Sequence, residues 1–391
     1  NGIERKGGEG KGCQYENFHP AISGGHFPPR PLYLTGVFML DSNFNQQKAE
    51  AFSEGLIDTL NKAAIALGLS IGNRVGLFEA MAGLPASTSQ QIADAAGLNE
   101  RYVREWLGTM VTGKIVTYSP ETKAYQLPAE HAAFLTSGGV YNFAASMEFV
   151  PVLAGVEDKL IESFRNGGGV PYSEYPRFHE VMAAESAQTI VAALEPHIIP
   201  IVPGLKEKLE AGIDVLDVGC GSGRAMTVLA EKYPNSRFAG YDFSEEGIAR
   251  ATADAKAKGL TNVRFEVRDA ANIGETEAYD LITSFDAIHD QADPAGMLRS
   301  INQALRPDGV YLVQDITGSS HLEKNLELPV APWLYTISCM HCMTVSLAQG
   351  GDGLGAMWGE ELAEQMMKDA GFTNVQINHL EHDAMNTYYV V

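Results

Sequence analysis

The chain of 391 residues is 45% hydrophobic and 20% charged, which is typical of a globular protein and excludes a wholly disordered chain. Lys and Arg number 28 against 49 Asp and Glu, so a formal net charge of −21 disfavours nonspecific binding to nucleic acid. No apolar run reaches the ~18 residues that a membrane span needs, and the four cysteines favour a reducing cytoplasm over a disulfide framework.

The first 38 residues differ in composition from the rest of the chain. Gly, Pro and polar residues dominate residues 1–38, with neither a helical nor a strand period, so we expect a flexible tail. The first methionine is Met39. Two interpretations stay open: the natural domain begins near Met39 and the upstream stretch is not native, or the tail is a genuine part of the protein.

Residues 39–137 are predicted to form a winged-helix domain, because a helix-turn-helix pattern is followed by a hairpin pattern. Ser87 to Ser89 contain the cap of one helix, Gly97 makes the turn and Asn99 caps the next helix. The expected elements are helices over 47–68, 77–81, 90–96 and 99–111 and a hairpin over 115–127.

The predicted recognition helix of this domain has no net charge. Arg101 and Arg104 are balanced by Glu100 and Glu105, whereas a helix that reads DNA usually has a basic face. The apolar first helix, over 56–69, fits a dimer interface better. We therefore expect a homodimer and no nucleic-acid partner, with a DNA-binding regulator as the rival hypothesis.

A mainly helical connector and cap is predicted over 138–200, and an α/β domain over 201–391. From residue 213 strands alternate with helices, which predicts a parallel sheet with helices on both faces. The final helix is expected over 360–370. The predicted strands cover 213–218, 236–242, 263–268, 280–285, 309–315, 374–380 and 386–391.

A glycine-rich loop, Gly219-Cys-Gly-Ser-Gly223, follows the first strand of this domain directly. Glycines let the backbone turn sharply and approach a ligand closely. Counted from Gly219, the sixth position of a dinucleotide-binding motif is Arg224 rather than glycine, so that motif fails. A P-loop fails too, because no Gly-Lys-Ser/Thr follows.

Carboxylates stand at the ends of the first three strands, at Asp217, Asp242 and Asp269. Parallel strands bring their carboxyl ends to one crevice, where such sheets bind ligands. Asp242 lies 19 residues after Gly223, a spacing that suits an acid accepting both ribose hydroxyls. Asp269 is expected to reach an adenine amino group.

These motifs, with Asp280-Leu-Ile-Thr-Ser-Phe285, resemble those of class I S-adenosylmethionine-dependent methyltransferases over about 200–391. The preceding winged helix resembles that of small-molecule O-methyltransferases, and 40–391 as a whole resembles a bacterial group of winged-helix methyltransferases. The resemblance implies S-adenosylmethionine as cofactor, with the glycine loop at its methionine end. The cofactor-binding residues it implies are Asp217, Gly219, Gly221, Gly223, Asp242, Phe243, Asp269, Ala270, Phe285 and Asp286.

The resemblance also implies a fold. We expect an α/β, Rossmann-like, seven-stranded doubly wound sheet whose last strand is antiparallel. A mainly helical winged-helix domain precedes this sheet.

His289 is the leading candidate for a general base, because it follows the fourth strand, just past the cofactor crevice. In the plant-type O-methyltransferases that it resembles, a histidine of a His-Asp pair acts as base, and a near-neutral pKa suits that task. The alternative is a histidine that caps a helix or binds backbone. Asp290 either orients the imidazole or, like Asp293, caps the next helix. Gln-Ala-Asp follows Asp290 where the plant enzymes have Trp-Ser-Asp.

An insertion over 317–359 combines aromatic, Met and His residues with the glycine-rich stretch 349–355, which favours a lid over the substrate. His341 is expected to touch substrate or to act as a second base. Cys339, His341 and Cys342 suggest zinc, but on a helix His341 points away from the two cysteines, so no metal is expected. The predicted substrate contacts are His179, Tyr335, Cys342 and Trp358.

The sequence thus predicts a cytoplasmic, homodimeric methyltransferase that transfers methyl to an oxygen of a small molecule. Sulfur and nitrogen acceptors stay open, as does a regulator or sensor that only binds the cofactor.

Overall fold

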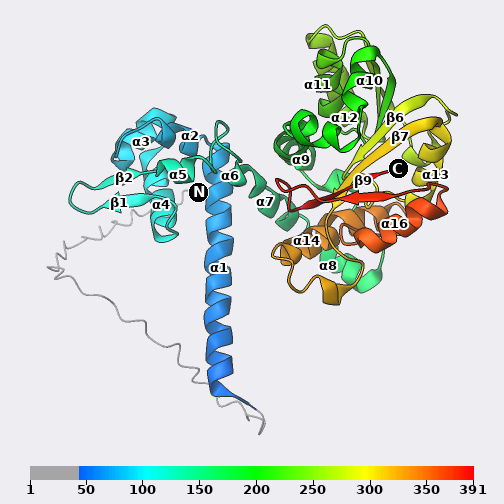
Figure 1. Cartoon of the computed structure of the whole chain (residues 1–391). Helices are drawn as coiled ribbons and strands as arrows, with labels where there is room; N and C mark the ends of the chain where they lie inside the picture. Colours follow the sequence, from blue (N-terminus) through cyan, green and yellow to red (C-terminus); the bar gives the residue numbers. More distant parts are fainter. Residues whose placement is uncertain (1–43) are drawn as a thin grey trace, which may run out of the picture. The chain divides into compact units, whose positions relative to one another are not determined.

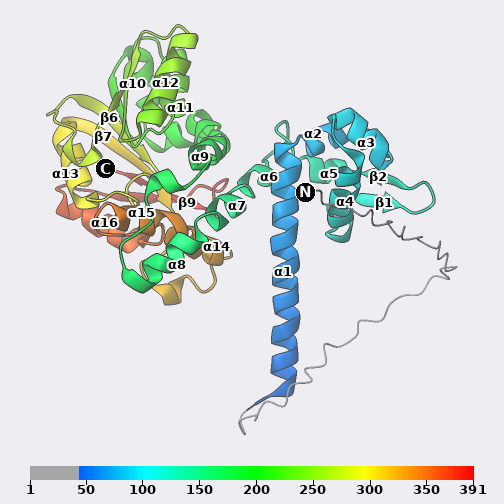
Figure 2. The same cartoon turned by 180° about the vertical axis from the view of Figure 1, so that it is seen from behind.

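The computed structural model describes residues 44–391, and the predictions about residues 1–38 and Met39 lie outside them. Figures 1 and 2 show the described chain from opposite sides. Within 44–391, no helix combines the length and the apolar character that crossing a membrane requires.

The winged-helix prediction is confirmed in its elements. Thr88 closes the expected cap: its side chain accepts from the Gln91 backbone while the Gln91 side chain accepts from the Thr88 backbone. The elements are α1 (Gln46–Arg74), α2 (Leu77–Ala82), α3 (Ser89–Ala96), α4 (Glu100–Thr112), β1 (Thr117–Ser119) and β2 (Ala124–Gln126).

Small residues let the C-terminal part of α1 pack closely on the winged helix. A Cβ at Gly68 would lie 2.6 Å from Met110, and one at Gly72 would lie 2.6 Å from Trp106. The Trp106 indole donates to the Gly68 carbonyl at 2.8 Å. Only this end of the helix is therefore committed to the winged-helix core.

Short helices connect the winged helix to the sheet domain. Arg177 adopts a left-handed backbone (φ 66°) immediately before α9 and forms ion pairs with Glu148 and Glu180. The segment comprises α5 (Ala129–Ala132), α6 (Phe143–Ser146), α7 (Phe149–Ala154), α8 (Glu157–Asn166), η1 (Tyr172–Glu174), α9 (Phe178–Ser186), η2 (Ala187–Val191), η3 (Leu194–Ile198) and η4 (Ile199–Ile201).

The described chain contains a seven-stranded sheet of order β5-β4-β3-β6-β7-β9-β8, in which β9 runs antiparallel to both of its neighbours. The predicted Rossmann-like, doubly wound fold with an antiparallel last strand is confirmed. The strands are β3 (Asp214–Val218), β4 (Arg237–Asp242), β5 (Val263–Val267), β6 (Tyr279–Phe285), β7 (Leu305–Ile316), β8 (Gln376–Asn378) and β9 (Asn386–Val390).

Alternation along the strands builds a core on each face of the sheet. Val215 packs with α10 (Leu205–Ala211) and α11 (Arg224–Lys232) on one face. The next residue, Leu216, packs with α13 (Pro294–Ala304) and α16 (Gly359–Asp369) on the other. Figures 1 and 2 show these helix pairs on opposite sides of the sheet. A further helix, α12 (Glu245–Ala257), joins β4 to β5.

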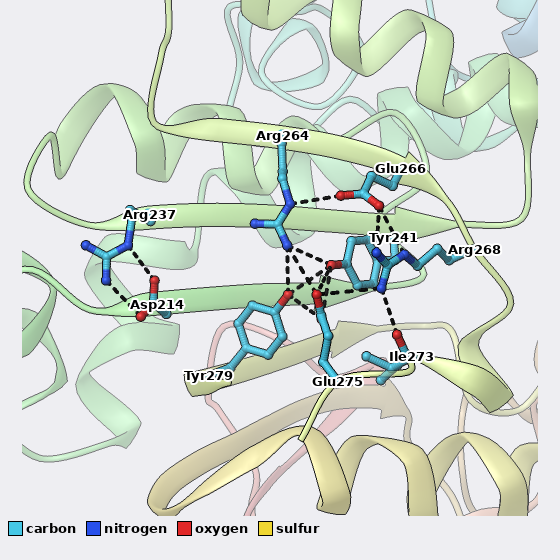
Figure 3. A network of polar contacts seen from close by, with 9 residues as sticks. All are labelled: Asp214, Arg237, Tyr241, Arg264, Glu266, Arg268, Ile273, Glu275 and Tyr279. Atoms are coloured by element: carbon cyan, nitrogen blue, oxygen red, sulfur yellow. Dashed lines mark hydrogen bonds and ion pairs between the residues drawn. The ribbon is translucent and has the colours of Figure 1, made fainter. Parts of the chain in front are cut away.

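Figure 3 shows a polar network that ties β5 to β4 and β6. Arg264 donates to the hydroxyls of Tyr241 at 2.8 Å and Tyr279 at 3.1 Å. Arg268 lies 4.3 Å from the centre of the Tyr241 ring and donates to the Ile273 carbonyl at 2.7 Å. The network braces the turn after β5, which belongs to the edge of the sheet where ligands are expected.

The insertion between β7 and α16 folds into η6 (Leu322–Lys324), α14 (Ala331–Ile337), the π-helical turn η7 (Ser338–Cys342) and α15 (Met343–Ala348). Its glycine-rich stretch and α15 both bind the loop after β6. The Gly355 backbone donates to the His289 carbonyl at 3.0 Å, and the Ser346 hydroxyl donates to the Gln291 carbonyl at 2.7 Å. The insertion is therefore attached to the segment that carries the predicted base.

Candidate active site

Two adjoining cavities open at the carboxyl ends of the parallel strands. The larger has a volume of about 890 Å³ and the smaller about 300 Å³. Both walls include Gly219, Asp242, Phe243 and Gln291. The larger cavity extends from the glycine loop to α9 and the insertion, so it has room for a second ligand beside one held at the glycine loop.

The glycine loop has the backbone that the sequence predicts for close ligand approach. Gly219, Gly221 and Gly223 all have positive φ, at 79°, 52° and 67°. A Cβ at Gly219 would lie 2.4 Å from Ala287, whereas a Cβ at Gly221 would meet nothing within 4 Å. Gly221 therefore leaves open space in the cavity wall, where a bound molecule can lie against its backbone.

Asp242, at the end of β4, fixes this loop. Its carboxylate accepts from the backbone of Gly221 and of Ser244, both at 2.8 Å. Burial raises the pKa of Asp242, and the two hydrogen bonds lower it by less. A carboxylate oxygen has further lone pairs, so Asp242 can still accept from hydroxyls of a ligand in either cavity.

Asp217 lies deeper in the same wall. It is buried and accepts from the Thr283 hydroxyl at 2.7 Å. Burial raises its pKa to about 7, against the smaller effect of that hydrogen bond. Phe285 and Asp286, at the end of β6, line the larger cavity too, and burial raises the pKa of Asp286 to about 7.

The smaller cavity contains the remaining predicted cofactor residues. Phe243, Asp269 and Ala270 line it, and the Phe243 side chain is 44% exposed. The Asp269 carboxylate accepts from the Ala271 backbone at 2.9 Å. Gln349 of the insertion, which the sequence analysis did not single out, completes this wall. An apolar ring and a carboxylate in one cavity wall suit a flat base that carries an amino group.

His289 is buried at the border of the larger cavity, and its Nδ1 lies 2.6 Å from a carboxylate oxygen of Asp315 on β7. Asp315 binds Nδ1, and the Cys342 side chain also forms a hydrogen bond with the ring. Asp315 and not Asp290 therefore orients the imidazole. Asp293 caps α13 by accepting from the Gly296 backbone at 2.7 Å.

The electrostatics of His289 are set by opposing effects. Burial lowers the pKa of the imidazole, but the Asp315 carboxylate and the Cys342 side chain outweigh burial and hold that pKa well above its usual value. The Asp315 carboxylate therefore favours the protonated ring. A cation bound nearby lowers the pKa by repulsion and frees the nitrogen to accept a proton.

Asp290 also lines the larger cavity. Among the described residues, its carboxylate accepts only from the Gln291 side-chain amide, at 3.2 Å. Burial raises its pKa to about 6, against the effect of His289.

Aromatic contacts fix His341 in the wall of the larger cavity. It is 2% exposed and stacks on Phe178 of α9, with ring centres 3.6 Å apart. Tyr172 meets it edge-on at 5.1 Å. Its Nε2 has no hydrogen-bond partner in the described chain, and burial lowers the pKa of this histidine well below its usual value. His341 therefore carries a ring nitrogen that no described residue satisfies, and its environment disfavours the charged ring.

The four predicted substrate contacts separate into two groups. His179 and Cys342 line the larger cavity. Tyr335 and Trp358 are absent from its walls: the Tyr335 hydroxyl binds the Asn325 amide at 3.0 Å, and the Trp358 indole donates to Asp315 at 3.3 Å. Trp358 thus helps to fix the partner of His289.

Sequence reasoning missed Asp315 and Tyr172. Asp315 carried a usable signal, because it ends the fifth strand as other acids end the first three. Tyr172 stands in a short helix of the connector and carried no comparable signal. Within 44–391, no group of three or more His, Cys, Asp or Glu side chains is arranged to hold a metal ion.

The fold and this strand-end site define a class of protein. Residues 63–137 match the family described as Rv2258c-like winged HTH domain, and residues 209–371 match the family described as Methyltransferase domain. The chain therefore joins a winged helix-turn-helix domain to a methyltransferase domain of the class I fold, as the resemblance implied.

Solved structures share this arrangement. Human N-acetylserotonin methyltransferase in complex with SAM aligns with a TM-score of 0.64 at 16% identity, covering 90% of this chain and 99% of that one. The mitomycin 7-O-methyltransferase aligns with a TM-score of 0.65 at 17% identity, covering 88% and 99%. At these identities the likeness establishes the fold.

Curated relatives match a shorter stretch. Trans-aconitate 2-methyltransferase of Acidovorax sp. is 29% identical over 147 residues, which are 38% of this chain and 52% of that protein. Malonyl-[acyl-carrier protein] O-methyltransferase of Bacillus cereus is 28% identical over 159 residues, 40% of this chain and 52% of that protein. The chain spans about half the length of these relatives.

Proposed function

We propose that this protein is an S-adenosylmethionine-dependent methyltransferase that transfers methyl to an oxygen of a small molecule. The observation that carries the proposal is the adjacency of two sites. A glycine loop with an open backbone position at Gly221 and the carboxylate of Asp242 adjoins a buried His289 held by Asp315.

The residues present fit the cofactor. Phe243, Asp269 and Ala270 would hold the adenine, Asp242 the ribose hydroxyls and the glycine loop the methionine part. Arg224, the first residue of α11, also lines the larger cavity. Its guanidinium donates to the Ala183 carbonyl at 2.7 Å and suits the methionine carboxylate. When bound, the cofactor supplies a methyl group activated by a sulfonium sulfur.

The chain's own residues orient the acceptor and accept its proton. Asp315 fixes the His289 ring through Nδ1, so the other ring nitrogen accepts the proton of an acceptor hydroxyl that displaces the Cys342 side chain. The resulting imidazolium is stabilised by the Asp315 carboxylate, which is already its partner. The insertion and α9 close the cavity around the acceptor and hold it in line for transfer.

Sulfur and nitrogen acceptors are the first alternative, since the same imidazole also serves a thiol or an amine. A regulator or sensor that binds the cofactor without turnover is the second. The buried His289–Asp315 pair favours an enzyme over a sensor, because a sensor needs no group that accepts a proton.

Mass spectrometry of a metabolite extract incubated with the chain and methyl-deuterated S-adenosylmethionine tests this function. We expect a product that carries the deuterated methyl on oxygen and is absent with heat-denatured protein. Calorimetry with S-adenosylhomocysteine is the companion measurement. No binding there would contradict the cofactor assignment, and binding without any labelled product would favour the sensor.

We also propose a cytoplasmic homodimer without a nucleic-acid partner. The α1 surface presents Leu56, Leu60, Leu67 and Ile71 on one face, and each side chain is at least 44% exposed. An apolar face of this kind suits a second copy of the chain. The absence of net charge on α4 argues against DNA.

The substitution Leu60→Glu is expected to convert the dimer into a monomer, because it introduces two charges into an apolar interface. Light scattering coupled to size-exclusion chromatography measures the mass. Asn61→Glu is the matched control, since its side chain leaves the helix in another direction and should preserve the dimer. A monomeric wild-type chain, or a dimer in both variants, would contradict this interface.

A further inference from the structure

The wall of the larger cavity has an unusual charge distribution away from the glycine loop. Carboxylates line this part, from α9, the end of β6 and the β8–β9 hairpin, and no Lys or Arg of the described chain accompanies them. The two arginines of the wall, Arg224 and Arg250, stand on the helices that follow β3 and β4. The carboxylates are Glu185, Asp286, Asp290 and Asp383.

These carboxylates differ in the number of hydrogen bonds that they accept from the described residues. Glu185 accepts from the hydroxyls of Tyr141 and Ser146, and Asp383 accepts from the Tyr388 hydroxyl and the Asn386 amide. Asp290, by contrast, has a single amide contact within the described chain, at 3.2 Å. Asp290 is partly exposed in the cavity wall, so its carboxylate can accept further hydrogen bonds from a ligand.

Two further polar groups line the same cavity as Asp290. The imidazole of His341 is 2% exposed and has an Nε2 without a partner among the described residues. Tyr172 contacts the edge of that ring, and the charge of Asp290 raises the pKa of the Tyr172 hydroxyl, after the larger effect of burial. The Phe178 ring stacks on His341, and its centre lies 5.5 Å from the centre of the Tyr172 ring.

Carboxylates and aromatic rings without a Lys or Arg are the chemistry that recognises an ammonium group. The carboxylate and the imidazole accept its N–H groups, and the rings of Tyr172 and Phe178 attract its charge. A carboxylate ligand would meet four like charges in this part of the wall, with His289 as the group that could offset them.

We propose that the methyl acceptor is an alcohol or phenol that also carries a protonated amine, and that Asp290, His341 and Tyr172 receive the ammonium group. This inference rests on the proposed function and specifies its substrate class. His341 then acts in substrate recognition, whereas His289 accepts the proton.

A matched series of three naphthols tests the inference. They are 6-(aminomethyl)naphthalen-2-ol, which is cationic, 6-methylnaphthalen-2-ol, which is neutral, and 6-hydroxy-2-naphthoic acid, which is anionic. Calorimetry measures their binding to the full chain in saturating S-adenosylhomocysteine. We expect the amine to bind roughly tenfold more tightly than the neutral compound, and the acid most weakly.

The Asp290→Asn variant should weaken binding of the amine by roughly tenfold, since it removes the charged partner, and leave the neutral naphthol within about twofold. Asp352→Asn is the matched control. It makes the same change at an exposed position of the insertion outside both cavity walls and should leave the order of affinities unchanged.

Equal affinities for the three naphthols, no binding of any of them, or an undiminished preference for the amine in Asp290→Asn would overturn the inference. Failure of S-adenosylhomocysteine to bind would instead count against the proposed function, so the two failures are distinguishable.

Discussion

Replacing His289 with Asn is expected to slow methyl transfer by about 10²- to 10⁴-fold, the range that a positioned general base contributes. The Asn amide can still donate to Asp315, so the buried carboxylate keeps a partner and the cavity keeps its shape. The measurement is the rate of deuterated-methyl incorporation into the product at saturating concentrations of both substrates. Calorimetry should find binding of S-adenosylhomocysteine unchanged.

The pH profile separates a base from a merely structural histidine. The pKa of His289 lies above its usual value, and only the deprotonated ring accepts a proton. The wild-type rate should therefore rise with pH as the ring loses its proton. In His289→Asn this limb should disappear.

His321→Asn is the matched control, because His321 is exposed and lies outside both cavity walls. A His289→Asn variant that retains the wild-type rate and pH limb would rule out the base. The protein would then only position the two substrates, and the acceptor hydroxyl would lose its proton without help from a protein base.

Replacing Asp242 with Ala is expected to weaken binding of S-adenosylhomocysteine by about 10²-fold, equivalent to ~2.7 kcal/mol. Two effects combine in this loss. The ribose hydroxyls lose their acceptor, and the Gly221 and Ser244 backbone groups lose the carboxylate that fixes the glycine loop. Calorimetry measures the affinity directly.

Asp254→Asn on α12 is the control for the change in net charge, since that residue is exposed and lines neither cavity. Its affinity should equal that of the wild type. Unchanged affinity in Asp242→Ala would remove Asp242 from the cofactor site and with it the arrangement of the ribose proposed above.

The sheet domain was predictable because its signals are local. Each strand is a short apolar run that ends at a polar residue or a glycine. The strands near 213–218 and 236–242 were therefore predicted to within a residue of β3 and β4. The strand near 374–380 was predicted too long: β8 covers Gln376–Asn378, and the left-handed backbone of Asn374 precedes it.

The partner of His289 could not be predicted in the same way. Asp315 is 26 residues away in sequence, and the two meet only because β6 and β7 are adjacent strands in a fixed register. The neighbouring Asp290 looked equally suitable in sequence. Its side chain instead lies in the cavity wall, where Gln291 is its contact.

The insertion is a second region whose structure could not be predicted from the sequence. Ordinary helical spacing brings Cys339 and Cys342 to one face and turns His341 away. The structure has a π-helical turn over Ser338–Cys342, which adds residues per turn. His341 and Cys342 therefore both line the cavity, and Cys339 does not. Nothing in the sequence indicated this change of helical pitch.

The division of the cavity walls has an evolutionary consequence. The glycine loop and the strand ends stand between residues 217 and 270, whereas the side chains of the proposed ammonium site come from 172–178, 290 and 341. Mutations that alter acceptor preference can thus accumulate while the glycine loop and Asp242 stay unchanged. A duplicated gene of this architecture can acquire a new substrate through the connector, the loop after β6 and the insertion.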